Sequence, residues 1–225
     1  MTGLQILYID DDGVKIMLEQ ELLEDLRQRT TLENEFLSSS ATDILSHLNR
    51  TNPDFYTYRS IIKRFNLPDH ERFDIVTHAD LNFIETMGNH FLNLNQSPSN
   101  PLLLPTLERT AAIHTTIALL NNLFLSVNDK INFNWIEIET LLTQSTKWDG
   151  VGFHAGLDKK IGHFIRFHDM RLYFELVFLV DDQFIRRTHV TVKLPTTPSE
   201  LKDFFNQTDS LFAWKKSLID SLQLY

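Results

Sequence analysis

The clearest pattern along this chain is the alternation of apolar and polar positions over residues 171–180. The even positions are all apolar: Leu172, Phe174, Leu176, Phe178 and Val180. Because consecutive side chains of a strand point to opposite faces, the segment predicts a strand that buries one complete face. Runs over 161–168 and 184–194, joined to it by short Asp-containing turns, complete a predicted three-stranded antiparallel meander.

Helical spacing dominates the chain before this meander. Apolar residues that recur every three or four positions predict amphipathic helices in several segments. These segments are 14–26, 55–65, 81–92 and 113–124. We also expect helix over 32–37 and a short helix from Asn134, where Glu137 would complete a capping box. Thr197 followed by Pro198 is a strong signal for the start of a final helix.

Two short apolar runs, 4–9 and 73–77, are typical of strands. The predicted fold class is therefore α+β, with a mostly helical first two-thirds followed by the meander and a C-terminal helix. The glycine-rich connector 147–162 is the best candidate boundary. It divides the chain into a mainly helical region, 1–147, and a sheet with its C-terminal helix, 148–225. One continuous domain remains an open alternative.

Composition narrows the class of protein. With 225 residues, 42% of them hydrophobic, the chain can bury a sizeable core. A net charge of −9 disfavours a nucleic-acid interface and docking on anionic membranes, and no apolar run is long enough for membrane insertion. The absence of cysteine excludes disulfides and thiol chemistry. Without a secretory signal pattern at its start, the chain is predicted to be cytoplasmic and to need no cofactor.

An acidic triplet, Asp10-Asp11-Asp12, follows the first apolar run and precedes an amphipathic helix. One interpretation is that these carboxylates cap the helix and complement its dipole. This opening also resembles that of a response-regulator receiver domain, which implies Mg²⁺ at Asp10 and Asp11 and Asp80 as candidate phosphoacceptor. Asp80 follows later than that family normally allows, and the family's later Ser/Thr and Lys positions are missing. The resemblance therefore implies a degenerate receiver-like signalling domain.

Other patterns that could carry chemistry favour ordinary structural roles. Four histidines lie in the final third of the chain: His154, His163, His168 and His189. A metal site built from them is disfavoured, because no His-Glu-x-x-His pattern occurs and a strand would place His163 and His168 on opposite faces. The glycine loop 150–156 matches neither a dinucleotide fingerprint nor a P-loop, and no Gly-x-Ser-x-Gly elbow occurs. The sequence predicts no catalytic residue and a protein that is not an enzyme.

The leading hypothesis is a non-enzymatic adaptor or accessory subunit that binds other proteins within a larger cytosolic assembly. In composition alone the chain resembles secretion chaperones and coupling-complex adaptors. Exposed aromatic side chains would anchor a partner protein. Arginines that form a basic stripe on the sheet would bind an acidic partner. The alternatives are burial of each aromatic ring in the core and a solvated strand face for the arginines. The candidate partner-binding residues are Phe55, Tyr56, Tyr58, Trp148, Phe153, Arg186, Arg187 and Trp214.

Overall fold

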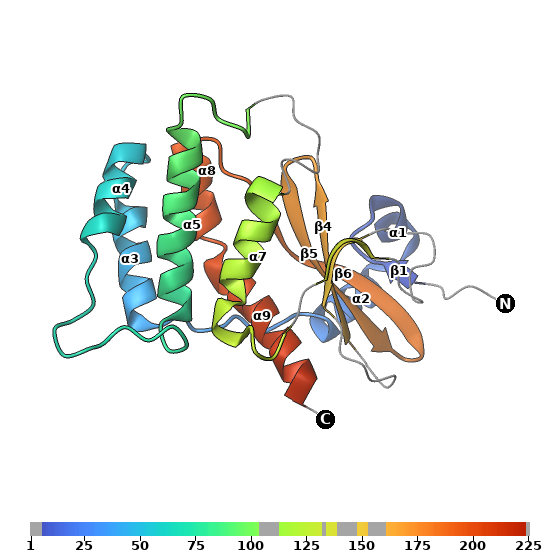
Figure 1. Ribbon diagram of the computed structural model, residues 1–225. Coiled ribbons are helices and arrows are strands. Elements are labelled where there is room, and N and C mark those ends of the chain that lie inside the picture. Colours follow the sequence, from blue (N-terminus) through green and yellow to red (C-terminus); the bar gives the residue numbers. More distant parts are fainter. Residues whose placement is uncertain (1–5, 104–112, 132–133, 139–147, 153–160, 224–225) are drawn as a thin grey trace.

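The fold places a group of helices beside a twisted sheet, with the C-terminal helix α9 between them (Figure 1). The computed structural model describes residues 6–103, 113–131, 134–138, 148–152 and 161–223. Helices precede most of the strands along the chain, and two helices close it. The α+β prediction is therefore confirmed.

The helices and strands follow one another in a simple order. The helices are α1 (Asp12–Met17), α2 (Gln20–Arg29), α3 (Ser39–Arg50), α4 (Phe55–Arg64), α5 (Ala79–Asn95), η1 (Ile113–Ile117), α7 (Ala118–Leu123), η2 (Leu125–Val127), α8 (Pro198–Phe205) and α9 (Thr208–Gln223). The strands are β1 (Ile6–Tyr8), β2 (Asn134–Ile138), β3 (Trp148–Gly152), β4 (Ile161–His168), β5 (Arg171–Val180) and β6 (Gln183–Lys193).

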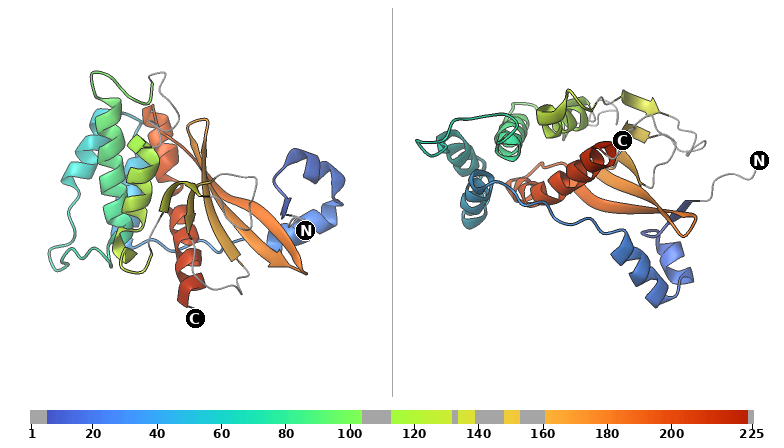
Figure 2. Two further views of the ribbon diagram at one scale, coloured as in Figure 1. Left: turned by 45° about the vertical axis from the view of Figure 1, so that its right-hand side comes forward. Right: turned by 90° about the horizontal axis from the view of Figure 1, so that it is seen from below.

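The strands form one mixed sheet in the order β1-β6-β5-β4-β3-β2. The central part is the predicted antiparallel meander of β4, β5 and β6. It is extended at one edge by β3 and β2, both antiparallel, and at the other by β1, which lies parallel to β6. The N-terminal strand thus completes a sheet whose other strands all come from the second half of the chain, and Figure 2 shows β1, α1 and α2 at that end of it.

Two-residue turns fix the register of the meander. Asp169 and Met170 join β4 to β5 with φ of 50° and 56°, and Asp181 and Asp182 join β5 to β6 with φ of 48° and 63°. Two successive left-handed residues are the geometry of a type I′ turn, whose twist matches that of the strands. Asp tolerates this conformation better than most residues. The predicted turns are confirmed.

The core lies where the even-numbered face of β5 meets α9. Trp214 at the centre of α9 is 0% exposed, with its ring 5.1 Å from that of Phe174 and 6.1 Å from that of Phe124. On the far side of α9, the ring of Phe212 lies 5.7 Å from that of Phe83 in α5. One cluster of buried side chains therefore includes residues from before and after position 148.

Four local predictions are wrong because tertiary contacts override the local signal. Residues 32–37 are extended, since they carry the chain from α2 beside the sheet to α3. The capping box at Asn134 does not start a helix, because β2 pairs with β3 instead. Part of the glycine-rich connector is that same strand β3. The run 73–77 forms a turn, in which the Asp74 carboxylate accepts hydrogen bonds from two following N–H groups.

Two of the predicted helix caps, at the acidic triplet and at Thr197, are confirmed. Asp11 accepts hydrogen bonds from the N–H groups of Gly13 and Val14 at the start of α1. Thr197 caps α8, whose first residue is Pro198. In the described residues, none of the helices combines the length and the apolar character that crossing a membrane requires.

Candidate functional site

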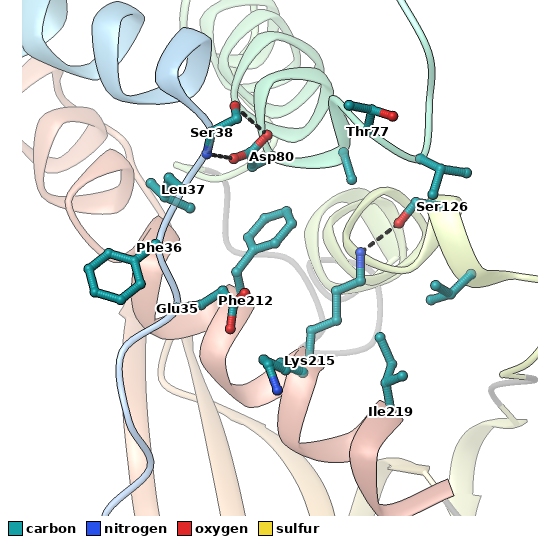
Figure 3. Close-up of a pocket in the computed structure, with 14 residues that line it drawn as sticks. Glu35, Phe36, Leu37, Ser38, Thr77, Asp80, Ser126, Phe212, Lys215 and Ile219 are labelled. Carbon is teal, nitrogen blue, oxygen red and sulfur yellow. Dashed lines mark hydrogen bonds between the residues drawn. The ribbon is translucent and has the colours of Figure 1, made fainter. Parts of the chain in front are cut away.

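A groove opens where the extended segment 31–38, the turn before α5, η2 and α9 meet (Figure 3). Its volume is about 450 Å³, and pockets for small ligands typically span roughly 300–1,000 Å³. We call it the α9 groove. It is lined by Glu35, Phe36, Leu37, Ser38, Val76, Thr77, Ala79, Asp80, Ser126, Val127, Phe212, Lys215, Lys216 and Ile219.

One face of α9 forms the floor of the groove. Phe212, Lys215, Lys216 and Ile219 recur at intervals of three, one and three residues, which places them on one side of a helix. The opposite side of α9 faces the sheet through Trp214. One side of α9 therefore packs in the core, and another side lines the groove.

Lys215 lies in the floor with its amine turned inward. The residue is 5% exposed, and its Nζ donates a hydrogen bond of 2.7 Å to the hydroxyl of Ser126 (Figure 3). The amine also lies 4.9 Å from the centre of the Phe212 ring. Burial lowers the pKa of Lys215 to about 8, and the negative charge of Asp80 opposes part of that effect. Lysine amines with a strongly lowered pKa are found mainly at binding or catalytic sites.

Lys216, the next residue, has the opposite environment. Its side chain is about half exposed and forms an ion pair with Asp220 one turn along α9. That carboxylate raises the pKa of Lys216. Two neighbouring lysines of one helix therefore differ sharply in the chemistry available to their amines, which makes Lys216 a natural control for Lys215.

Asp80 ties the wall of the groove to the start of α5. Its carboxylate accepts hydrogen bonds from the backbone N–H and the hydroxyl of Ser38 and from the N–H of Leu81. The Ser38 hydroxyl in turn accepts from the N–H of Ala41 and caps α3. Asp80 thus holds the end of the extended segment against α5 and is itself almost fully satisfied.

Phe36 projects from the extended segment at the mouth of the groove. It is 98% exposed, and Val76 on the opposite lip is 63% exposed. In Figure 3 the Phe36 ring lies at the outer edge, away from Asp80 and Lys215. A fully solvated Phe beside an apolar groove is a common mark of a contact surface.

The lip that carries Val76 depends on a buried histidine. His78 is 3% exposed, and its Nε2 lies 3.0 Å from a carboxylate oxygen of Glu71. The ring of Phe73 stacks on it with centres 5.7 Å apart. Glu71 raises the pKa of His78, and Asp74 adds to the effect. Protonation of His78 therefore strengthens the contacts that shape this lip.

The aromatic residues predicted to bind partners occupy different environments. Tyr58 and Trp214 are 0% exposed and belong to the core, so a partner cannot reach them in the folded protein. Phe55 is half-buried and packs against the same core, whereas Tyr56 is 78% exposed. The Trp148 side chain and all of Phe153 lie outside the described residues. Of the described aromatic candidates, Tyr56 is the most accessible to a partner.

The two predicted arginines lie on opposite faces of the sheet and do not form a common stripe. Arg186 pairs with Glu175 at 2.7 Å, and Glu175 is 0% exposed. Arg166 also approaches the same carboxylate, at 3.3 Å. Arg187 donates to the carbonyl of Arg27 at the end of α2. Arg186 therefore compensates the charge of Glu175, which is buried on the odd-numbered face of β5, and Arg187 binds the C-terminal end of α2.

The acidic residues of the receiver-like interpretation serve three separate local roles. Asp10 accepts a hydrogen bond from the N–H of Thr188, Asp11 caps α1, and Asp80 binds Ser38. In the described residues no three acidic or histidine side chains gather closely enough to hold a metal ion. The structure thus does not bring these aspartates together as the Mg²⁺ interpretation requires.

Two histidines of the sheet, His163 and His189, contact α9. His163 is buried, lies 3.1 Å from the Ser217 hydroxyl, and packs edge-on against Trp214. His189 lies within hydrogen-bonding distance of the Ser210 carbonyl. His189 is partly buried and lies at a bulge of β6, between the residues that pair with Phe174 and Glu175.

Sequence reasoning did not single out the α9 groove. The signal for it is a lysine within the apolar stripe of the last helix, since Lys215 follows Leu211 by four residues and precedes Leu218 by three. Phe36 carried no signal, because its exposure depends on the path of the extended segment.

Comparison with known protein families, curated proteins and solved structures finds no match.

Proposed function

We propose that this protein is a non-catalytic binding protein, an adaptor or accessory subunit that docks a segment of a partner protein in the α9 groove. The observation that carries the proposal is the position of Phe36, 98% exposed at the edge of a largely apolar groove of about 450 Å³. Burying one Phe side chain contributes roughly 1.5–3 kcal/mol. A partner segment that covers this ring and enters the groove would gain that contribution to its binding free energy.

Capture of partners from an extract of the source organism tests this function. The immobilised wild-type protein is compared with Phe36→Ser and with Leu103→Ser, a control that alters another exposed apolar residue, 68% exposed. We expect at least one protein to be retained by the wild type and the control and lost from Phe36→Ser. Equal retention by all three, or no retained protein, contradicts docking at this groove.

A second candidate function, nucleophilic catalysis, is favoured by one contact. The Ser126 hydroxyl lies 2.7 Å from the Lys215 amine, whose pKa is lowered to about 8 by burial. A neutral amine at that position could accept the serine proton, as in serine–lysine hydrolases. A fluorophosphonate probe would then label Ser126 in the wild type and not in Lys215→Met. Absence of labelling in the wild type removes this candidate.

A further inference from the structure

The positive charge of Lys215 is not balanced at short range. In the part of the chain that the structure describes, the polar contact of its Nζ is the neutral hydroxyl of Ser126, and no carboxylate comes within ion-pair distance. Asp80 acts on it only through its charge at longer range, and its oxygens accept hydrogen bonds from Ser38 and Leu81. A buried charge without a partner is unfavourable. Any ligand that supplies an anion relieves this cost.

The amine also has hydrogen-bonding capacity to spare. An ammonium group carries three N–H donors, and the contact with Ser126 uses one of them. Since the Ser126 oxygen accepts in that contact, its own O–H remains able to donate. Lys216 does not compete, because its amine is engaged by Asp220. The floor of the groove therefore offers two kinds of donor at one point.

We propose that Lys215 and Ser126 anchor a carboxylate of the docked partner segment, with a neighbouring apolar side chain of that segment packed on Phe212. This inference rests on the proposed function and assigns the chemistry of the segment: an acidic residue next to an apolar one. The ligand oxygens take the free N–H groups of Lys215 and the hydroxyl proton of Ser126. The apolar side chain occupies the part of the groove between Phe212 and Ile219.

The charges around the groove favour a carboxylate over a phosphate group. Glu35 and Asp80 are acidic and belong to the wall. Of the two lysines in the floor, Lys216 is paired with Asp220, so Lys215 supplies the buried cation that a ligand can meet. A dianion would exceed that single charge and meet repulsion from both carboxylates. A carboxylate monoanion matches it, and most of the remaining lining is apolar. Charge complementarity thus selects an acidic peptide segment over a phosphorylated one.

Selection from random peptides displayed on phage tests the proposal without a known partner. Peptides are selected on the wild-type protein and then measured against Lys215→Met and the control Lys63→Met, which alters an exposed lysine of α4 outside the groove. We expect the enriched peptides to share an Asp or Glu beside an apolar residue. Their affinity should fall at least tenfold for Lys215→Met and change less than twofold for Lys63→Met. Replacing the acidic residue with its amide should cause the same tenfold loss.

The outcomes separate this proposal from the proposed function. Peptides that need Phe36 but show no acidic preference, and bind Lys215→Met as well as wild type, overturn the carboxylate anchor and support docking. Peptides that prefer phosphomimetic clusters of acids also overturn it. If no selected peptide depends on the groove, the proposed docking function is overturned. A direct measurement with small carboxylate probes then tests whether Lys215 and Ser126 bind a carboxylate.

That direct measurement uses 3-phenylpropanoate and its amide as probes in an NMR titration of the wild type. We expect the carboxylate to shift the Lys215 side-chain signals and to raise the pH at which they titrate, at probe concentrations where the amide does not. Identical effects of the two probes, or effects of equal size at Lys63 outside the groove, overturn the anchor. Thermal unfolding of Lys215→Met verifies that the variant is folded before either experiment.

Discussion

Replacing Lys215 with Met should stabilise the protein, because it removes a charge that the fold buries without an ion-pair partner. Burial lowers the pKa of Lys215 from 10.5 to about 8. Each pKa unit corresponds to about 1.4 kcal/mol, so the charge destabilises the folded state by up to about 3 kcal/mol. Losing the hydrogen bond to Ser126 offsets about 1 kcal/mol. The expected net gain near pH 7 is therefore about 2 kcal/mol.

The gain should depend on pH in a defined direction. Below a pH of about 8, Lys215 is charged in both states and the penalty is complete. Between about 8 and 10.5 the unfolded chain holds the proton that the folded protein has released, so the wild type becomes more stable as pH rises. The advantage of Lys215→Met should accordingly shrink across this window. Its Met side chain keeps most of the apolar packing of the lysine stem.

Urea unfolding of the wild type, Lys215→Met and Lys216→Met at several pH values provides the measurement. Titrations elsewhere in the protein cancel in the difference between wild type and variant. Lys216→Met removes a lysine whose pKa is raised by Asp220, so it should show no comparable gain. A Lys215→Met variant that is less stable than wild type near neutral pH, or a difference that stays constant up to pH 10.5, would refute the reasoning.

Three further predictions follow from other buried groups. Glu175→Gln should lower the free energy of unfolding by about 3 kcal/mol, measured in urea, because it removes the 0%-exposed carboxylate that Arg186 binds; an unchanged midpoint would contradict the importance of this pair. Asp80→Ala should destabilise by about 2 kcal/mol and speed cleavage by a Glu-specific protease within 31–38, since Ser38 loses its acceptor; unchanged cleavage would show that the segment is held by other contacts. Glu71 raises the pKa of His78 in the folded state, so this contact contributes stability that is complete below about pH 6.5 and lost as pH rises through the raised value. The destabilisation caused by His78→Gln should therefore be larger in acid than at pH 9, and a loss independent of pH would contradict it.

Much of the sheet and of the last two helices could be predicted from sequence because their signals are local. The alternation along β5, the Asp turns and the Thr197 cap each involve residues within a few positions of one another. The same reasoning was wrong at Asn134, where a helix signal lost to pairing with β3. Strand pairing joins residues that are distant in sequence, and no local pattern reports it.

The candidate site could not be predicted, because it depends on distances that the sequence does not contain. Lys215 and Ser126 are separated by 89 positions, and their contact exists because α9 packs beside η2. The exposure of Phe36 depends on a segment held at Ser38 by Asp80, 42 positions away. The local sequence shows which residue types are present, but it does not show which of them are in contact in the folded protein.

By itself, the sequence determined the strands of the meander, their turns, the helix starts with strong caps and the face of β5 that enters the core. The tertiary structure decided which charges are buried and which aromatic rings reach solvent. It enclosed Glu175 between strands, turned Trp214 inward and left Phe36 outside. The physical reason is that backbone conformation responds to neighbours in sequence, whereas desolvation of a charge or a ring responds to everything that packs around it.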